Sequence, residues 1–197
     1  MNALTADEQD ARDMARLVNG HDAALNDLME RHGERLFHYL IRSLQDENDA
    51  ADLAQETFVR VFQNRWRFNP SQKFTTWLYA IASNLVRDRY RWRSRHPQVS
   101  LDAENDQTEA SLKDNLPNTE EAPDQGLQTR ERADAVRRAV TALPAELRQP
   151  LILAVYQDLP QAEIAAILKC SVKAVETRIY RARQQLRESL AELGQTL

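Results

Sequence analysis

Apolar residues recur at helical spacing through most of this chain. The runs Ala24–Met29 and Leu36–Ile41 predict two helices near the start. A third helix is predicted from about Asp46 to Gln63 and a fourth from about Phe74 to Trp92, with a polar break between them. Glycine is scarce and no alternating β-branched run is present, so we expect an all-α fold.

Residues 96–128 interrupt this periodicity. They contain Pro97, Pro117 and Pro123 among many amide and carboxylate side chains, which predicts a flexible acidic linker. Helical spacing resumes from about Thr129 to Leu193. We therefore expect two small helical domains, over residues 1–95 and 129–197, joined by a linker at residues 96–128.

The segment from Leu159 to Arg183 predicts two short helices around a tight turn. Pro160 suits the start of the first helix, and Ser171 suits the N-cap of the second. At about 100° per residue, the second helix separates an apolar face from a polar, cationic one. The polar face contains Lys173, Glu176, Thr177, Tyr180, Arg181 and Gln184. Such a face suits a DNA major groove, although an ordinary solvated helix hairpin has the same pattern.

The net charge of −4 hides a division of the chain into charged blocks. Acids outnumber bases up to Phe58, and five arginines with one acid lie between Asn84 and Arg95. The linker then has eight acids and one lysine between His96 and Gln128. Blocks of alternating sign indicate several partners of different charge.

Several classes of protein are disfavoured by composition. No apolar stretch approaches the roughly 18 residues of a membrane span, and the acidic N-terminus is unlike a secretory signal, so we expect no membrane insertion. The single cysteine, Cys170, fits a reducing cytoplasm. No histidine lies at ligand spacing to the carboxylates, so we expect no metal, no cofactor and no small-molecule substrate. A metal-dependent enzyme using His21, His32 and His38 is a remote alternative.

The third predicted helix has one acidic face with a single aliphatic residue. That face contains Asp49, Asp52, Glu56, Val59 and Gln63, with Gln55 and Arg60 on its flanks. An acidic stripe of this kind suits docking on a basic partner helix, although many such faces only interact with water.

The fourth predicted helix combines an apolar face with a basic one. Phe74, Trp77, Leu78, Ile81 and Leu85 point inward, whereas Asn84, Arg87, Asp88, Arg91 and Arg95 lie on another face. Tyr90 and Trp92 alternate with arginines. Because arginine binds phosphates and exposed aromatic rings stack on unpaired bases, this helix predicts nucleic-acid binding.

Taken together, three motifs resemble a known family. DAADLAQETFVRVF, then FTTWLYAIASNLVRDRYRWR, then the stretch from LPAELRQP to RQQLRESL are similar to extracytoplasmic-function sigma factors. These are the small bacterial sigma factors that have only the second and fourth conserved sigma domains. The resemblance implies a non-enzymatic protein that directs core RNA polymerase to promoters, recognising the −35 element and melting the −10 element.

The resemblance also implies a role for individual residues. Contact with the clamp helices of the largest polymerase subunit is expected from Asp49, Asp52, Gln55, Glu56 and Val59. Contact with the −10 element is expected from Asn69, Ser71, Lys73, Phe74, Asn84, Arg87, Asp88 and Arg91. Contact with the −35 element is expected from Ser171, Lys173, Glu176, Thr177, Arg178, Tyr180 and Arg181. The flap of the second subunit and an anti-sigma factor are further expected partners.

Three positions depart from the family pattern. Ala51 replaces a third acid in the stripe, and Glu176 stands where basic residues are common. Lys169 stands where the turn often has glycine, and a positive φ there would cost a non-glycine residue of order 1 kcal/mol. The alternative interpretation is a stand-alone helix-turn-helix regulator that binds operator DNA as a dimer without polymerase.

Overall fold

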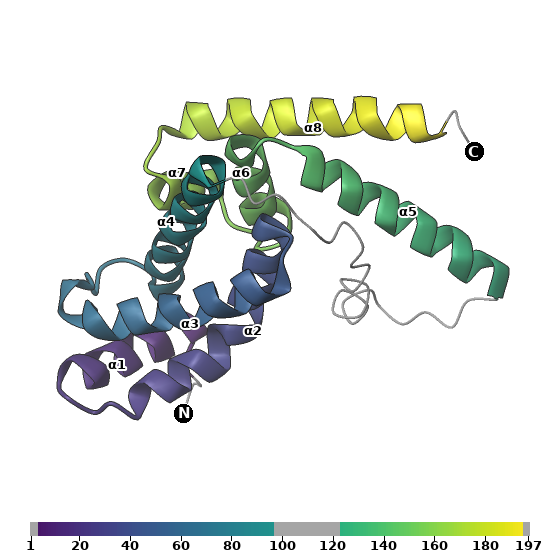
Figure 1. Ribbon diagram of the computed structural model, residues 1–197. Helices are drawn as coiled ribbons and strands as arrows, with labels where there is room; N and C mark the ends of the chain where they lie inside the picture. The colour runs from purple at the N-terminus through teal and green to yellow at the C-terminus, as the bar shows by residue number, and fades with distance from the viewer. Residues whose placement is uncertain (1–3, 97–122, 195–197) are drawn as a thin grey trace.

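The computed structural model describes residues 4–96 and 123–194, and the secondary structure in these ranges is helical throughout (Figure 1). The first part contains α1 (Ala6–Val18), α2 (Ala24–Leu44), α3 (Glu47–Gln63), the 3₁₀ helix η1 (Arg65–Arg67) and α4 (Phe74–Arg95). The second part contains α5 (Pro123–Ala142), α6 (Ala145–Val155), α7 (Gln161–Leu168) and α8 (Val172–Gly194). The expected all-α fold is confirmed.

Two boundaries differ from the sequence-based expectation. The two apolar runs near the start belong to one helix, α2, which continues through Gly33. Helix α5 begins at Pro123, inside the segment predicted as linker, because proline is well suited to the first helical position. The rest of the predicted linker, residues 97–122, lies outside the described residues.

The N-terminal helices surround a core provided mainly by α2, α3 and α4. Leu36, Val61 and Val86 are completely buried there. Tyr39 is also buried, and its hydroxyl lies 2.8 Å from Ser83 Oγ on α4. Buried apolar faces on three helices explain why the helical spacing is so clear in this part of the sequence.

Helix α1 is attached to α2 by charged groups. Asp10 is 1% exposed, and its Oδ1 lies 2.8 Å from His32 Nε2. Arg31 donates to Asp13 Oδ2 over 2.8 Å and also pairs with Asp10. The His32 ring then packs against Phe74 with 5.2 Å between the ring centroids. Through Phe74, these contacts hold the first residue of α4 against α2.

The C-terminal helices form the predicted helix-turn-helix. Ile164 and Ile167 of α7 pack with Val175 and other buried residues of α8. The Ser171 hydroxyl accepts from the Ala174 backbone N–H over 3.2 Å, as expected for an N-cap. Lys169 has φ of 52°, so the turn places a non-glycine residue in the left-handed conformation.

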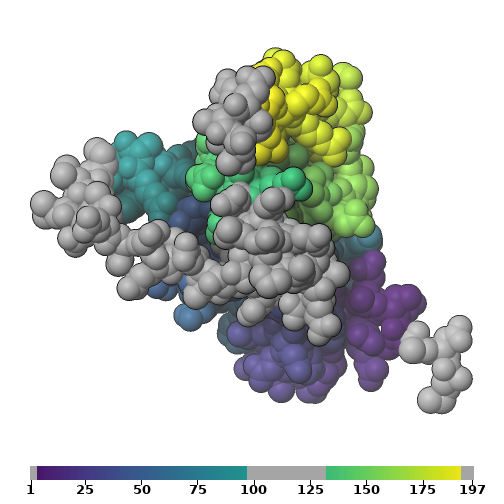
Figure 2. Space-filling model, turned by 90° about the vertical axis from the view of Figure 1, so that its right-hand side faces the viewer, coloured from purple at the N-terminus to yellow at the C-terminus, as the bar shows by residue number. Residues whose placement is uncertain are grey.

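The two groups of helices are in contact (Figures 1 and 2). Helices α2 and α4 pack against α6 and α7, so one continuous apolar core runs through both parts. Tyr79 donates to Gln157 Oε1 over 2.6 Å, and both residues are buried. The Arg42 guanidinium lies 4.4 Å from the centre of the Tyr156 ring. The packing therefore combines apolar burial with polar contacts.

Among the described helices, none is both long and apolar enough to cross a membrane. The same residues contain no group of three or more histidine, cysteine or acidic side chains placed to hold a metal ion.

Candidate nucleic-acid interface

The acidic stripe on α3 is only partly exposed. Asp52, Gln55 and Val59 face solvent, and Val59 is 45% exposed. Glu56 is half-buried and pairs with Arg60 Nε over 2.8 Å. The surface available to a partner is therefore a mixed acidic and aliphatic strip along the middle of α3.

Asp49 does not belong to this exposed strip, which corrects the expectation that it lies on the exposed acidic face. Its side chain is 14% exposed and accepts from Arg89 over 2.5 Å and from Arg93 over 2.6 Å. Arg93 also pairs with Asp46 over 3.0 Å. A carboxylate held between two guanidinium groups has its oxygens occupied, so Asp49 attaches α3 to α4. Arg89 and Arg93 are correspondingly less available to DNA.

Tyr90 is likewise not an exposed stacking surface. Its ring is half-buried and its hydroxyl donates to the Ser43 carbonyl oxygen. The alternating aromatic and basic residues of α4 therefore include residues that pack against other helices as well as residues that are exposed.

The loop before α4 has an exposed tip and a buried anchor. Asn69 and Ser71 are exposed, and the Asn69 side chain accepts from the Ser71 backbone N–H over 3.0 Å. Phe74 is 1% exposed, and its ring packs against those of Phe68 and Trp77. Phe74 therefore anchors the loop, and its ring is not part of the exposed surface of the free protein.

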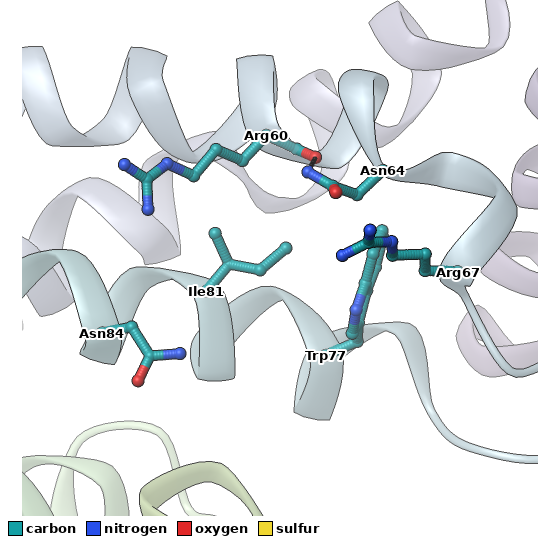
Figure 3. A pocket seen from close by; sticks show the side chains of 6 residues that line it. All are labelled: Arg60, Asn64, Arg67, Trp77, Ile81 and Asn84. Carbon is teal, nitrogen blue, oxygen red and sulfur yellow. Dashed lines mark hydrogen bonds between the residues drawn. The ribbon is translucent and has the colours of Figure 1, made fainter.

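A pocket lies beside this loop, between α3 and α4 (Figure 3). It has a volume of about 340 Å³. Its lining consists of Arg60, Asn64, Arg67, Trp77, Ile81 and Asn84. In Figure 3, Trp77 and Ile81 rise from α4, with the Arg67 guanidinium next to the indole ring.

Only Asn84 of this pocket was among the expected DNA contacts. Arg60 was placed on the flank of the acidic stripe, whereas Asn64 and Arg67 were missed. Arg60 and its C-cap neighbour Asn64 are four residues apart at the end of α3, and Trp77, Ile81 and Asn84 follow helical spacing on α4. The spacing was visible in the sequence, but the juxtaposition of the two helices was not.

The pocket has the chemistry of a nucleotide site. Trp77 and Ile81 supply apolar surface, the asparagines offer amide donors and acceptors, and the arginines offer cations. Unpaired bases stack on aromatic and apolar side chains while guanidinium groups bind the adjacent phosphates.

The second half of α4 faces the C-terminal helices across a groove of about 380 Å³. The groove is lined by Arg87, Tyr90, Arg91, Ala145, Glu146, Gln149, Pro150, Leu168, Lys169, Cys170 and Arg178. Arg87 donates to Asn84 Oδ1 over 3.2 Å, whereas Asp88 and Arg91 are exposed, with 3.8 Å between their charged groups. The cations of two expected DNA-binding helices thus meet in one groove.

Most of the residues expected to contact the −35 element are exposed on α8. Lys173, Glu176, Thr177, Tyr180 and Arg181 are exposed, and Tyr180 is 70% exposed. Lys173 pairs with Glu176 over 3.0 Å. Arg178 is different, because it is half-buried and approaches Cys170 Sγ at 3.6 Å in the groove toward α4.

Lys73, an expected −10 contact, is engaged by the C-terminal helices. Its Nζ lies 2.8 Å from Glu163 Oε1, and this hydrogen bond raises the pKa of Lys73. The charge on Lys73 is retained at neutral pH, but one of its contacts is already made.

Comparisons with known proteins agree with this geometry. The family model "Sigma-70 region 2" matches residues 28–96, and "Sigma-70, region 4" matches residues 133–186. The first match covers α3, the loop and α4, and the second covers the helix-turn-helix. The pocket and the polar face of α8 therefore lie in two separate sigma-70 regions.

Similar proteins match over nearly their whole length. The chain is 32% identical over 179 residues to ECF RNA polymerase sigma factor SigW of Bacillus subtilis, covering 90% of this chain and 95% of SigW. It is 34% identical over 172 residues to RNA polymerase sigma factor CnrH of Cupriavidus metallidurans, covering 87% and 89%. The structure of CnrH in complex with the cytosolic domain of CnrY superposes with a TM-score of 0.66 and 27% identity, covering 94% of this chain and 99% of CnrH. The chain belongs to the extracytoplasmic-function sigma factors of RNA polymerase.

Proposed function

We propose that this sigma factor directs core RNA polymerase to promoters through three separate surfaces. The exposed strip of α3 docks on polymerase, the loop and pocket at the start of α4 hold the opened −10 element, and α8 reads the −35 element. The observation that carries the proposal is the pairing of a nucleotide-sized pocket in region 2 with a polar helix-turn-helix face in region 4. Proteins of this family are initiation factors, not enzymes, and the family membership decides against a stand-alone operator-binding regulator.

Docking on polymerase rests on Asp52, Gln55 and Val59. An acidic strip with one exposed aliphatic residue complements a basic helix that has an apolar contact point. We assign the clamp helices of the largest polymerase subunit as its partner. Glu56 contributes if its bond to Arg60 opens on binding.

Opening of the −10 element rests on the pocket of Figure 3. Extruding one base from a duplex costs a few kcal/mol. Stacking on Trp77 and Ile81, hydrogen bonds to Asn84 and phosphate contacts from Arg60 and Arg67 would offset that cost. Asn69 and Ser71 are exposed at the loop tip and would contact the strand beside the pocket.

Reading of the −35 element rests on the exposed face of α8. Arg181 and Lys173 suit guanine or phosphate, and Glu176 can accept from a cytosine amino group. Arg178 joins this face only if it leaves the groove toward α4. Contact of region 4 with the flap of the second polymerase subunit completes the assembly.

An anti-sigma factor is a further proposed partner. CnrH, whose structure resembles that of this chain, was solved in complex with the cytosolic domain of CnrY. Since its polymerase partner is cytoplasmic, we assign the same compartment to this protein.

Run-off transcription with purified core polymerase tests the proposed function. Genomic fragments selected by the reconstituted holoenzyme should give discrete start sites that depend on this protein. Asn84→Ala should lower open-complex formation, detected by permanganate reactivity of unpaired thymines, without weakening polymerase binding. Tight, specific DNA binding by the protein alone, with no polymerase-dependent transcripts, would contradict the proposal.

A further inference from the structure

Glu163 of α7 reaches across the domain boundary to the first turn of α4. Its Oε1 lies 2.8 Å from Lys73 Nζ, and its Oε2 accepts from the Thr76 hydroxyl over 3.2 Å. The Glu163 side chain is 19% exposed. One carboxylate therefore bridges Lys73, at the end of the expected −10 loop, and Thr76, in the first turn of α4.

The start of α4 is built to receive an anion. Lys73 is the N-cap of this 22-residue helix, no side chain caps its N-terminal N–H groups, and no acid lies in its first turn. Unpaired N–H groups give a helix N-terminus a partial positive charge. The Lys73 ammonium adds to this charge, and the Thr76 hydroxyl supplies a further hydrogen-bond donor. Asp7 approaches Lys73 only at 3.9 Å, so Glu163 is the nearer anion.

We propose that the start of α4 is a binding site for a DNA phosphodiester and that Glu163 occupies this site when the two domains are packed together. This inference rests on the proposed function, in which the same helix holds the −10 strand. Carboxylate and phosphate oxygens are bound by the same donors at helix N-termini. Thr76 directly precedes Trp77, which lines the pocket, and Lys73 lies four residues before Trp77, so the phosphate would lie next to a bound base.

The site cannot bind Glu163 and DNA together. Glu163 is held in place by α7, which packs along α4, and by the buried bond between Tyr79 and Gln157. A DNA strand must therefore displace the Glu163 carboxylate from Lys73 and Thr76. The free sigma factor masks part of its own −10 surface with a negatively charged residue of its −35 domain.

The test compares DNA binding by the full-length protein and by Glu163→Gln, without polymerase. The probe is a fluorescein-labelled dT₁₂ oligonucleotide at low salt, because a phosphate site does not depend on base sequence. Glu188→Gln is the matched control, since it removes one negative charge from the same domain and, among the described residues, Glu188 accepts only from Gln184. Circular dichroism verifies that each variant is folded.

Glu163→Gln should bind the oligonucleotide about twofold to fivefold more tightly than the wild type, the range expected from one partly exposed ion pair. Glu188→Gln should show a smaller gain, from net charge alone. In a Lys73→Gln background the extra gain from Glu163→Gln should disappear. Equal gains in Glu163→Gln and Glu188→Gln, a gain that persists without Lys73, or no measurable binding by any variant would each overturn the proposal.

Failure of this inference can be distinguished from failure of the proposed function. If the wild type supports polymerase-dependent transcription but Glu163→Gln shows no gain in oligonucleotide affinity, only the proposal of a masked phosphate site is refuted. If the wild type also fails to support promoter-dependent transcription, the proposed function is refuted as well.

Discussion

Replacing Tyr79 with phenylalanine tests whether the bond between the two domains stabilises their packing. The Tyr79 hydroxyl donates to Gln157 Oε1 over 2.6 Å, and both residues are 4% exposed. Among the described residues, no second donor reaches that oxygen. Phenylalanine would leave a buried carbonyl oxygen unpaired, which costs about 1–3 kcal/mol.

Two further variants separate the hydrogen bond from the packing. Tyr79→Phe combined with Gln157→Leu removes both polar partners, so the double variant should recover most of the lost stability. Tyr180→Phe is the matched control, because Tyr180 is 70% exposed on α8. Its free energy of unfolding should stay within about 0.5 kcal/mol of the wild type.

Urea unfolding followed by two probes provides the measurement. The three tryptophans, Trp66, Trp77 and Trp92, all lie in the N-terminal helices, so their fluorescence reports that domain, whereas circular dichroism reports the whole chain. In the wild type the two transitions should coincide, and in Tyr79→Phe both should shift to lower urea. No loss of stability in Tyr79→Phe, or a double variant less stable than the single one, would refute the reasoning.

Three other changes test other parts of the structure. Asp52→Lys should weaken core polymerase binding about tenfold in a fluorescence titration. Asp49→Asn should instead lower the free energy of unfolding by about 1–3 kcal/mol, because one of the two paired arginines loses its acceptor oxygen and both lose the negative charge. Arg181→Ala should lower −35-dependent transcription about tenfold with unchanged polymerase affinity; equal output would exclude it from the −35 face. Burial raises the pKa of Tyr39 from 10.0 to about 12, so neutral Tyr39 stabilises the fold below pH 10 and this stability is lost as the pH rises to about 12. Tyr39→Phe should show a shallower loss over that pH range in urea titrations.

Local rules predicted the helix-turn-helix well. Ser171 caps α8 because a hydroxyl and an orphan N–H lie close together in sequence. Lys169 adopts the left-handed conformation that a tight turn between two helices requires. Both features depend on residues within a few positions of each other, so no knowledge of the tertiary structure was needed.

Features that depend on contacts between distant segments were not predictable in the same way. The spacing of α3 placed Asp49 on a polar face, but it could not show that Arg89 and Arg93 of α4 pair with that carboxylate. The burial of Phe74 depends on rings from other parts of the chain, His32 and Phe68. The pocket and the contact of Glu163 with α4 likewise require helices that are far apart in sequence.

The ion pairs of Asp49 have a mechanical consequence. They join α3, which is proposed to bind polymerase, to α4, which is proposed to bind the promoter. The paired residues are 40 and 44 positions apart in the sequence. When the DNA duplex opens, any force on α4 would be transmitted through these side chains to α3. The ion pairs would therefore keep α4 from moving relative to α3. The fixed spacing between α3 and α4 would then determine the distance between the bound polymerase and the opened base pair.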